Sequence, residues 1–326
     1  MRLRAVSTGR DVLGWMSVPE LPEVEVVRHG LQPAIVGARI ESVEVFDSRA
    51  LTRHTGSAAD FEARLLGRGM RAAVRRGKFL WLSLDAPDEA SPAVDTSLTP
   101  EAIMVHLGMS GQMLLREPGA PAERHERVRF AIRNPEHGEL AIVFADQRTF
   151  GSLAIDPLVP TPDGAAGGFG DEAPLVPAQA AHIGRDPLDP AFDEAAFRSR
   201  LARTASGIKR VLLDQTAASG IGNIYADEGL WAARIHPETA ARDLTTRAVN
   251  RLLTEVRAVL QKALAEGGTS FDAQYVNVNG QAGYFAHSLN AYGRDGEPCP
   301  RCGSPVLRMR FMNRSSHLCP DCQRKR

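Results

Sequence analysis

The sequence predicts a mixed α+β protein built from several parts, and three observations indicate this. Hydrophobic spacing is helical over residues 20–36, alternates with period two in the segments that follow, and is helical again from about residue 192. All four cysteines lie in the last 28 residues, which predicts a separate metal-dependent tail. The length of 326 residues allows two or three domains with a sizeable core.

The first part is predicted as one helix followed by antiparallel sheets. Apolar residues recur every three or four positions from Leu21 to Ile35, and Gly37 ends the helix. Period-two alternation then predicts half-buried strands around residues 40–45 and 128–132. Continuous apolar runs of strand length lie at residues 79–84 and 140–144.

Two segments are poor in core-forming residues, and four later segments are predicted as helices. Residues 85–100 are expected to form a long hairpin loop, and the glycine-rich residues 156–177 an interdomain linker. The expected helices cover residues 192–201, 208–213, 224–231 and 244–264.

Composition excludes several classes of protein. No apolar run approaches the roughly 18 residues that a membrane-spanning helix needs. The first 18 residues have too short an apolar patch for a signal peptide. The few, clustered cysteines predict a reducing cytoplasm rather than a secreted disulfide scaffold. The net charge is zero, so any attraction to a polyanion must come from local clusters.

The four cysteines have the spacing of a zinc site. Cys299 and Cys302 form one C-x-x-C knuckle, and Cys319 and Cys322 form a second one 16 residues later. Four thiolates at this spacing favour tetrahedral Zn²⁺ over unrelated thiols or a redox pair. With all four ligands supplied by the protein, the zinc is expected to be structural.

Two basic clusters could contact nucleic acid. From Arg294 to the C-terminus there are eight basic and three acidic residues, which fits either a nucleic-acid contact or a solvated tail. Residues 64–78 contain five arginines and Lys78 without an acidic residue, which also fits an exposed strand face. Lys78 is one of only four lysines, and its pKa can be tuned for proton transfer as that of arginine rarely can.

A short glycine motif leads into a predicted helix. Gly220 and Gly222, followed by Asn223, can present backbone N–H groups to a phosphate. By itself, a lone G-x-G favours close packing at the start of a helix over phosphate binding.

The motifs together resemble the formamidopyrimidine-DNA glycosylase family, bifunctional enzymes that excise oxidised purines and then cut the DNA strand. The resemblance spans residues 19–326 and implies an N-terminal helix plus β-sandwich, a helical helix–two-turn–helix domain and a C-terminal zinc-finger β-hairpin. The implied boundaries are 19–155, a linker over 156–185, 186–290 and 291–326. It follows the family's order through Pro19 to Glu25, Arg75 to Lys78, His106 to Gly111, Asp146 to Gly151, Gly222 to Tyr225, Gly283 to Phe285, Tyr292 to Arg294 and the four cysteines.

The resemblance assigns catalytic roles. Pro19 is expected to be the nucleophile, whose amine attacks C1′ of the damaged nucleotide to give a Schiff base. Glu20 is the expected acid/base group, supported by Glu23. Lys78 matches the lysine of proton transfer in β-elimination. Arg314 matches the arginine linked to phosphate binding and δ-elimination, of which phosphate binding suits a permanently charged group better.

The resemblance also assigns contacts with DNA. It implies that the protein binds a duplex and flips the damaged nucleotide out of the base stack. Met109 and Phe150 match apolar fillers of the gap, and Arg148 matches the group that pairs with the orphaned base. The protein is expected to act as a monomer on double-stranded DNA containing oxidised bases or abasic sites, with one structural zinc and no catalytic cofactor. The expected phosphate contacts are His106, His125, Asn223 and Tyr292, and Lys209 lies near the family's lesion-recognition lysine.

Two departures and two rival functions accompany this hypothesis. Asn313 and the serines after Arg314 replace more usual neighbours, and Gln281 stands where relatives often have lysine. One rival is the endonuclease VIII-like group, which prefers oxidised pyrimidines, although Leu21 stands where that group typically has glycine. The other rival is a catalytically silent binder of damaged DNA.

The second rival arises because Pro19 is internal in the sequence as written. An amide nitrogen has no lone pair free for attack, so the mechanism needs a free Pro19 amine. Arginine supplies 35 of the 39 basic residues, which suggests a GC-rich genome, where GTG often serves as a start codon. We therefore expect translation to start at Val18, read as methionine, which makes residues 1–18 an extension of the gene prediction.

Overall fold

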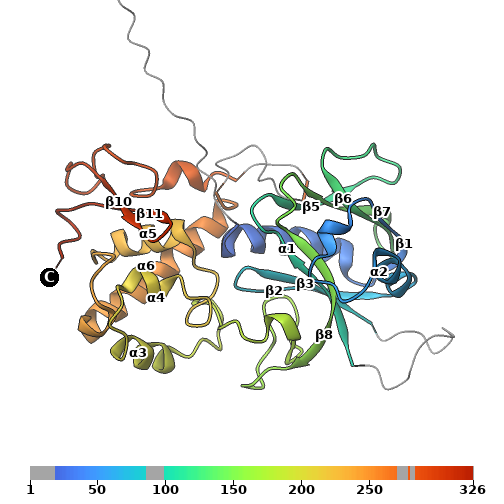
Figure 1. Cartoon of the computed structure of the whole chain (residues 1–326), viewed down its shortest axis with the longest axis horizontal. Coiled ribbons are helices and arrows are strands. Elements are labelled where there is room, and N and C mark those ends of the chain that lie inside the picture. The colour runs from blue at the N-terminus through green and yellow to red at the C-terminus, as the bar shows by residue number, and fades with distance from the viewer. Residues whose placement is uncertain (1–18, 86–98, 270–277, 280–282, 326) are drawn as a thin grey trace, which may run out of the picture.

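The computed structural model describes residues 19–85, 99–269, 278–279 and 283–325. A β-rich half and a helical half lie side by side, with α1 (Leu21–Ile35) between them (Figure 1). The expected extension at residues 1–18, residues 86–98 of the expected hairpin loop, and Gln281 lie outside the described residues.

The β-rich half consists of two antiparallel sheets. The four-stranded sheet has the order β1-β6-β7-β5 and the five-stranded sheet the order β2-β3-β4-β8-β9. The inner faces share one core, in which Phe130 from one sheet and Leu82 from the other are buried with the apolar face of α1. The strands are β1 (Arg39–Val45), β2 (Met70–Arg76), β3 (Phe79–Leu84), β4 (Glu101–His106), β5 (Gly111–Arg116), β6 (Glu126–Asn134), β7 (Gly138–Asp146), β8 (Ser152–Pro160) and β9 (Leu175–Pro177), and α2 (Ala58–Leu65) packs on β1.

The predicted elements of this half are confirmed. The helix expected over residues 20–36 is α1, and the apolar run at residues 79–84 is β3. Val128, Phe130 and Ile132 alternate inward on β6, as their spacing predicts. In β1 a register shift between Ile40 and Ser42 interrupts the alternation, so the core-facing set changes within the strand.

The segment expected as an interdomain linker contains strands of its own. Residues 156–160 continue β8, and residues 175–177 return as β9 beside it. Between them, Phe169 exchanges both backbone hydrogen bonds with Arg75, with N–O distances of 2.9 Å. The glycines of this segment allow close packing, because a Cβ at Gly168 would lie 2.3 Å from the carbonyl oxygen of Arg75.

The helical half confirms the four predicted helices. They are α3 (Glu194–Ala202), α4 (Ile208–Leu212), α5 (Asn223–Ala232) and the amphipathic α6 (Thr246–Ala265). Asp193 and Thr245 accept backbone N–H groups at the starts of α3 and α6, which sets where these helices begin. Leu21, the first residue of α1, is buried in the core of this half. None of the helices described here is long and apolar enough to cross a membrane.

The tail is a two-stranded hairpin docked on α5. Strands β10 (Leu307–Phe311) and β11 (Arg314–Leu318) pair from Leu307 with Leu318 to Phe311 with Arg314. Met312 and Asn313 therefore form the tip, where Met312 adopts a positive φ of 51°. Arg314 is exposed beside the tip. Short 3₁₀ helices lie at Ser48–Leu51, Ala178–Ala180, Ala241–Asp243 and Phe285–Ser288.

Candidate active site

The carboxylate of Glu20 lies at the N-terminus of α5. Its Oε2 accepts the N–H groups of Gly222 at 2.6 Å and Tyr225 at 3.4 Å, and its Oε1 accepts that of Ile224 at 3.0 Å. A Cβ at Gly222 would lie 2.2 Å from Cδ of Glu20, so only glycine leaves room for this carboxylate. The glycine motif thus binds an internal anion, and the phosphate-cradle interpretation of it is wrong.

Burial and neighbouring charges set the protonation of this carboxyl group. Glu20 is only 3% exposed, and burial raises its pKa to about 7. The negative charge of Glu23 adds to this rise, whereas the charge of Lys78 and the N–H donors of α5 oppose it. A carboxyl group with a pKa near neutrality can both donate and accept a proton at physiological pH.

Glu23 fixes the residues around Glu20. One of its oxygens accepts the hydroxyl of Tyr225 at 2.7 Å and the backbone N–H and hydroxyl of Thr269 at 2.7 and 2.8 Å. Its other oxygen accepts the backbone N–H of Glu20 at 2.9 Å. Four bonds to one buried carboxylate join the start of α1 to α5 and to the end of α6.

Lys78 lies in the turn between β2 and β3. Burial lowers its pKa, the charge of Arg314 lowers it further, and Glu20 and Glu23 raise it. The structure therefore places Lys78 within electrostatic reach of two other sequence-predicted residues, Glu20 and Arg314, and Glu20 directly follows the buried Pro19.

The hairpin that carries Arg314 is held by one buried carboxylate of α5. Asp227 accepts the hydroxyl of Ser316 at 2.8 Å and the backbone N–H of His317 at 2.9 Å. It also pairs with the ammonium group of Lys209 at 2.7 Å. The ammonium group bonds in turn to the carbonyl oxygen of Ser315 at 3.2 Å.

The environment of Lys209 does not support its expected contact with the lesion. Its side chain is fully buried, and its ammonium nitrogen lies 4.8 Å from the ring centre of Phe311. Burial lowers the pKa of its ammonium group, although the pairing with Asp227 raises it. The arrangement makes Lys209 a tie between the helical half and the hairpin.

Two of the expected phosphate contacts lie next to the hairpin. The side-chain amide of Asn223 donates to the carbonyl oxygen of Ser315 at 3.0 Å. Tyr292 packs edge-on against His317, with ring centres 5.0 Å apart, and burial raises the pKa of its hydroxyl to about 12. Neutral N–H and O–H groups of this kind can donate to phosphate.

His106 is suited to the same role in its neutral form. Burial lowers its pKa to about 4, and the charges of Arg53 and Lys78 add to the effect. Its Nδ1 accepts the backbone N–H of Gly108 at 3.1 Å, which leaves the proton of the neutral ring on Nε2 as a donor.

Another buried carboxylate, Asp146, holds together the two loops that carry the expected gap-filling residues. Its oxygens accept the hydroxyl of Ser110 at 2.5 Å and the backbone N–H groups of Arg148 at 3.1 Å and Gly151 at 2.7 Å. This ties the loop after β4, which carries Met109, to the loop after β7, which carries Arg148 and Phe150. The side chain of Phe150 is 60% exposed and therefore does not belong to the core.

His125 lies near these loops. It has a positive φ of 65°, and its carbonyl oxygen accepts the N–H of Asp146 at 2.9 Å. The backbone of this residue thus belongs to the same network, while its imidazole as a phosphate contact stays a prediction.

Sequence reasoning missed the buried acids that organise the site, Asp146, Asp227 and Glu228. Glu228 accepts the backbone N–H groups of Ala291 and Tyr292, both at 2.8 Å, and so fixes the segment that carries Tyr292. A signal was present, because Asp227 and Glu228 are adjacent acids within the otherwise apolar stretch of α5.

The four cysteines converge as their spacing predicts. Their sulfur atoms all lie within 4.8 Å of one another, and Cys302 Sγ is 3.4 Å from Cys319 Sγ and 3.6 Å from Cys322 Sγ. Zn–S bonds of about 2.3 Å in a tetrahedron require sulfur separations of about 3.8 Å, so the residues fit zinc. The indole N–H of Trp231 donates to Cys299 Sγ at 3.4 Å, an outer-shell contact from the end of α5.

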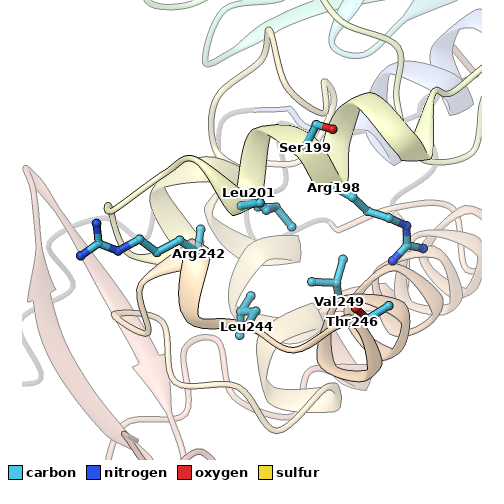
Figure 2. Close-up of a pocket in the computed structure, with 9 residues that line it drawn as sticks. Arg198, Ser199, Leu201, Arg242, Leu244, Thr246 and Val249 are labelled. Atoms are coloured by element: carbon cyan, nitrogen blue, oxygen red, sulfur yellow. The ribbon is translucent and has the colours of Figure 1, made fainter.

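A hollow in the helical half lies apart from this site. It has a volume of about 310 Å³ between α3 and the start of α6, with Leu201, Leu244 and Val249 along its wall and Arg198 and Arg242 at its sides (Figure 2). None of the predicted site residues lines it, so the catalytic interpretation does not depend on it.

The fold and site define a DNA-binding protein with a buried carboxyl group, a partly buried lysine and a zinc hairpin, and three family models cover most of the chain. Residues 18–153 match the formamidopyrimidine-DNA glycosylase N-terminal domain, and residues 183–274 match the H2TH domain of the same enzymes. Residues 296–324 match the zinc finger found in FPG and IleRS.

Relatives and solved structures agree with these matches. A formamidopyrimidine-DNA glycosylase of Leifsonia xyli is 60% identical over 94% of this chain and all of its own length, and one of Nocardia farcinica is 53% identical over 94% and 98%. The Lactococcus lactis Fpg bound to abasic-site DNA superposes with a TM-score of 0.75 at 30% identity, covering 94% of this chain and all of that one. The chain belongs to the formamidopyrimidine-DNA glycosylase family, and the cysteine cluster is its one structural zinc site.

Cys302→Ser is expected to lose zinc and to weaken duplex binding, because the hairpin has too small a core to fold without the metal. Metal content and the dissociation constant for an abasic-site duplex measure this. Asp321→Asn, a change of a neighbouring exposed side chain that is not a ligand, is the control and should keep both. Full zinc occupancy with unchanged binding in Cys302→Ser would contradict the prediction.

Phe150→Ala is expected to slow excision of a damaged base more than cleavage of a ready-made abasic site. An abasic nucleotide is cheaper to extrude, so a gap-filling side chain matters less for it. Single-turnover rates on the two duplexes give the comparison, and Phe46→Ala, at another exposed phenylalanine (50% against 60% for Phe150) outside the expected wedge, is the control. Equal losses on both duplexes would assign Phe150 a general structural role.

Proposed function

We propose that this protein is a base excision repair glycosylase and lyase for oxidised purines. It removes 8-oxoguanine and formamidopyrimidines from duplex DNA and cuts the strand at the resulting abasic site. The observation that carries this function is the convergence of Glu20, Lys78 and Arg314 beside Pro19 in a chain of this family. Lactococcus lactis Fpg, a relative, has been solved with Fapy-dG DNA and with abasic-site DNA.

Pro19 supplies the nucleophile. The lone pair of its secondary amine attacks C1′, the C1′–N bond to the base breaks, and the base leaves with the bonding pair and takes up a proton. The attached nitrogen then loses its proton and the C1′–O4′ bond breaks, with O4′ taking up a proton, which gives a cationic imine between Pro19 and the opened sugar. This step requires a free Pro19 amine, since an amide nitrogen cannot attack.

Glu20 transfers protons during this step. With a pKa of about 7, its carboxyl group can protonate the opening sugar and later accept a proton from the intermediate. The N-terminus of α5 holds the carboxylate in place and lowers its pKa against the effect of burial. Glu23 acts through Glu20 by fixing its backbone N–H.

Lys78 and Arg314 act in the elimination steps. In β-elimination a proton leaves C2′ and the C3′–O bond breaks, so that the 3′ phosphate departs. In δ-elimination a proton leaves C4′ and the C5′–O bond breaks, so that the 5′ phosphate departs. Burial favours the neutral amine of Lys78, which can accept protons. Arg314, exposed at the tip of the hairpin, stays charged and binds the phosphate groups.

The remaining contacts position a flipped nucleotide. Met109 and Phe150 fill the gap left in the stack, and Arg148 pairs with the orphaned base. Zinc, when bound by the four cysteines, would hold the hairpin together and would supply no catalytic chemistry. We place the protein in the bacterial cytoplasm, on the DNA, as a monomer. The phosphate contacts proposed are His106, His125, Asn223 and Tyr292.

Borohydride trapping tests the function. With a duplex containing 8-oxoguanine, reduction of the imine is expected to give a covalent protein–DNA adduct on Pro19, and an undamaged duplex is the control. Binding without any adduct would instead support a silent binder of damaged DNA. Faster trapping on an oxidised-pyrimidine duplex would support the endonuclease VIII-like specificity; one solved complex of Lactococcus lactis Fpg does contain an oxidised pyrimidine.

A further inference from the structure

Arg75 is a buried arginine to which the proposed function gives no role. It belongs to the basic cluster at residues 64–78, for which an exposed strand face is one expectation, yet its side chain is only 1% exposed. It lies near the end of β2, two residues before the turn that carries Lys78. A buried guanidinium must be paired, since an unpaired charge in the interior is costly.

The guanidinium of Arg75 bonds to three separate elements. Its Nε donates to Oε2 of Glu25 in α1 at 2.8 Å. Its Nη1 donates to Oδ2 of Asp186, at the start of the helical half, at 2.9 Å, and to the carbonyl oxygen of Gly77 at 3.2 Å. The ring of Phe169 packs on its face at 5.0 Å.

The same carboxylate also holds the turn. Oδ2 of Asp186 accepts the backbone N–H of Gly77 at 3.4 Å, so Gly77 is bonded at both its N–H and its carbonyl oxygen. The turn lies directly on the segment before α5, because a Cβ at Gly77 would lie 2.6 Å from Oγ of Ser219. Gly77 has a positive φ of 56° and is followed at once by Lys78.

We propose that Arg75 and Asp186 are positioning residues that hold the turn carrying Lys78 against the helical half, next to the helix that holds Glu20. This builds on the proposed function, because it assumes that Lys78 acts in elimination. The planar fork of arginine reaches Glu25, Asp186 and Gly77 in fixed directions, which the single ammonium group of lysine cannot do. A displacement of about 1 Å at a reacting group can cost roughly 100-fold in rate.

The chain contains a matched control for this proposal, because Asp186 and Asp189 make nearly the same local contacts. Each accepts the backbone N–H two residues further on through Oδ1, from Leu188 and Ala191 respectively, and an arginine through Oδ2. The partner of Asp189 is Arg185, at 2.7 Å. Only Asp186 contacts Arg75 and Gly77.

The experiment compares Asp186→Asn with Asp189→Asn on a duplex containing a ready-made abasic site. Imine formation is measured by borohydride trapping, and elimination by single-turnover strand cleavage. We expect Asp186→Asn to slow cleavage by on the order of tenfold while trapping is retained or increased, because the imine forms but is consumed slowly. Asp189→Asn should leave both within about twofold of the unchanged protein.

Two further variants separate positioning from stability. In a protein that already carries Lys78→Ala, Asp186→Asn should not slow strand cleavage any further. If Asp186→Asn acts by destabilising the fold, it should still slow cleavage in that protein. Arg75→Lys keeps the positive charge but loses the three-way contact. It replaces Asp186→Asn if that variant does not fold, and it should likewise slow cleavage while trapping is retained.

Several results would overturn the proposal. These are equal effects of the two asparagine variants, a parallel fall of trapping and cleavage, or an effect of Asp186→Asn that persists without Lys78. If Lys78→Ala alone cleaves as fast as the unchanged protein, both the role of Lys78 and this inference are wrong. Trapping of the unchanged protein would still support the glycosylase in that case, so the two failures can be told apart.

Discussion

The arrangement of the site depends on the carboxylate of Glu20 at the N-terminus of α5. Three backbone N–H groups at the start of α5 donate to this carboxylate, and the peptide dipoles of α5 favour a negative charge there. Leu21 follows into the core of the helical half, and its N–H donates to the carbonyl oxygen of Gly220 at 3.0 Å. The residue after Pro19 is thus positioned by residues about 200 positions later in the chain.

Helix α5 extends this organisation to the rest of the site through its own acids. Asp227 holds the zinc hairpin with Arg314, and Glu228 holds the segment with Tyr292. Trp231, near the end of the helix, donates to a zinc-binding cysteine. A helix of ten residues therefore fixes Glu20, the hairpin with Arg314 and the segment with Tyr292 relative to each other. Buried acids do this well because each accepts several N–H groups in fixed directions.

The sequence alone predicted the parts whose signals are local. Periodicity located α1 and the four helices, a continuous apolar run located β3, and the cysteine spacing located the zinc site. The motifs identified Glu20, Lys78 and Arg314, and the structure brings these residues together.

The sequence did not show which hydrogen-bond or ion-pair partner each polar group has in the fold. The glycine motif offers N–H donors, but only the fold shows that the anion is Glu20 rather than a phosphate. Arg75 is buried because Glu25 and Asp186, 50 and 111 residues away, reach its guanidinium. Lys209 pairs with Asp227 for the same reason, and the glycine-rich linker packs because its backbone contacts β2. Long-range pairing of this kind leaves no pattern in a single sequence.

The central claim is that α5 holds Glu20 in its working position, and Gly222→Ala tests it most directly. The added Cβ has no place beside Cδ of Glu20, while the φ of −119° at Gly222 suits alanine, so the strain falls on the carboxylate. Gly229→Ala, on the same helix but facing Val256 in α6, is the matched control for packing loss. Single-turnover excision of 8-oxoguanine should fall by on the order of 100-fold in Gly222→Ala, with zinc and duplex binding kept, and far less in Gly229→Ala. Excision at the unchanged rate in Gly222→Ala would contradict the account.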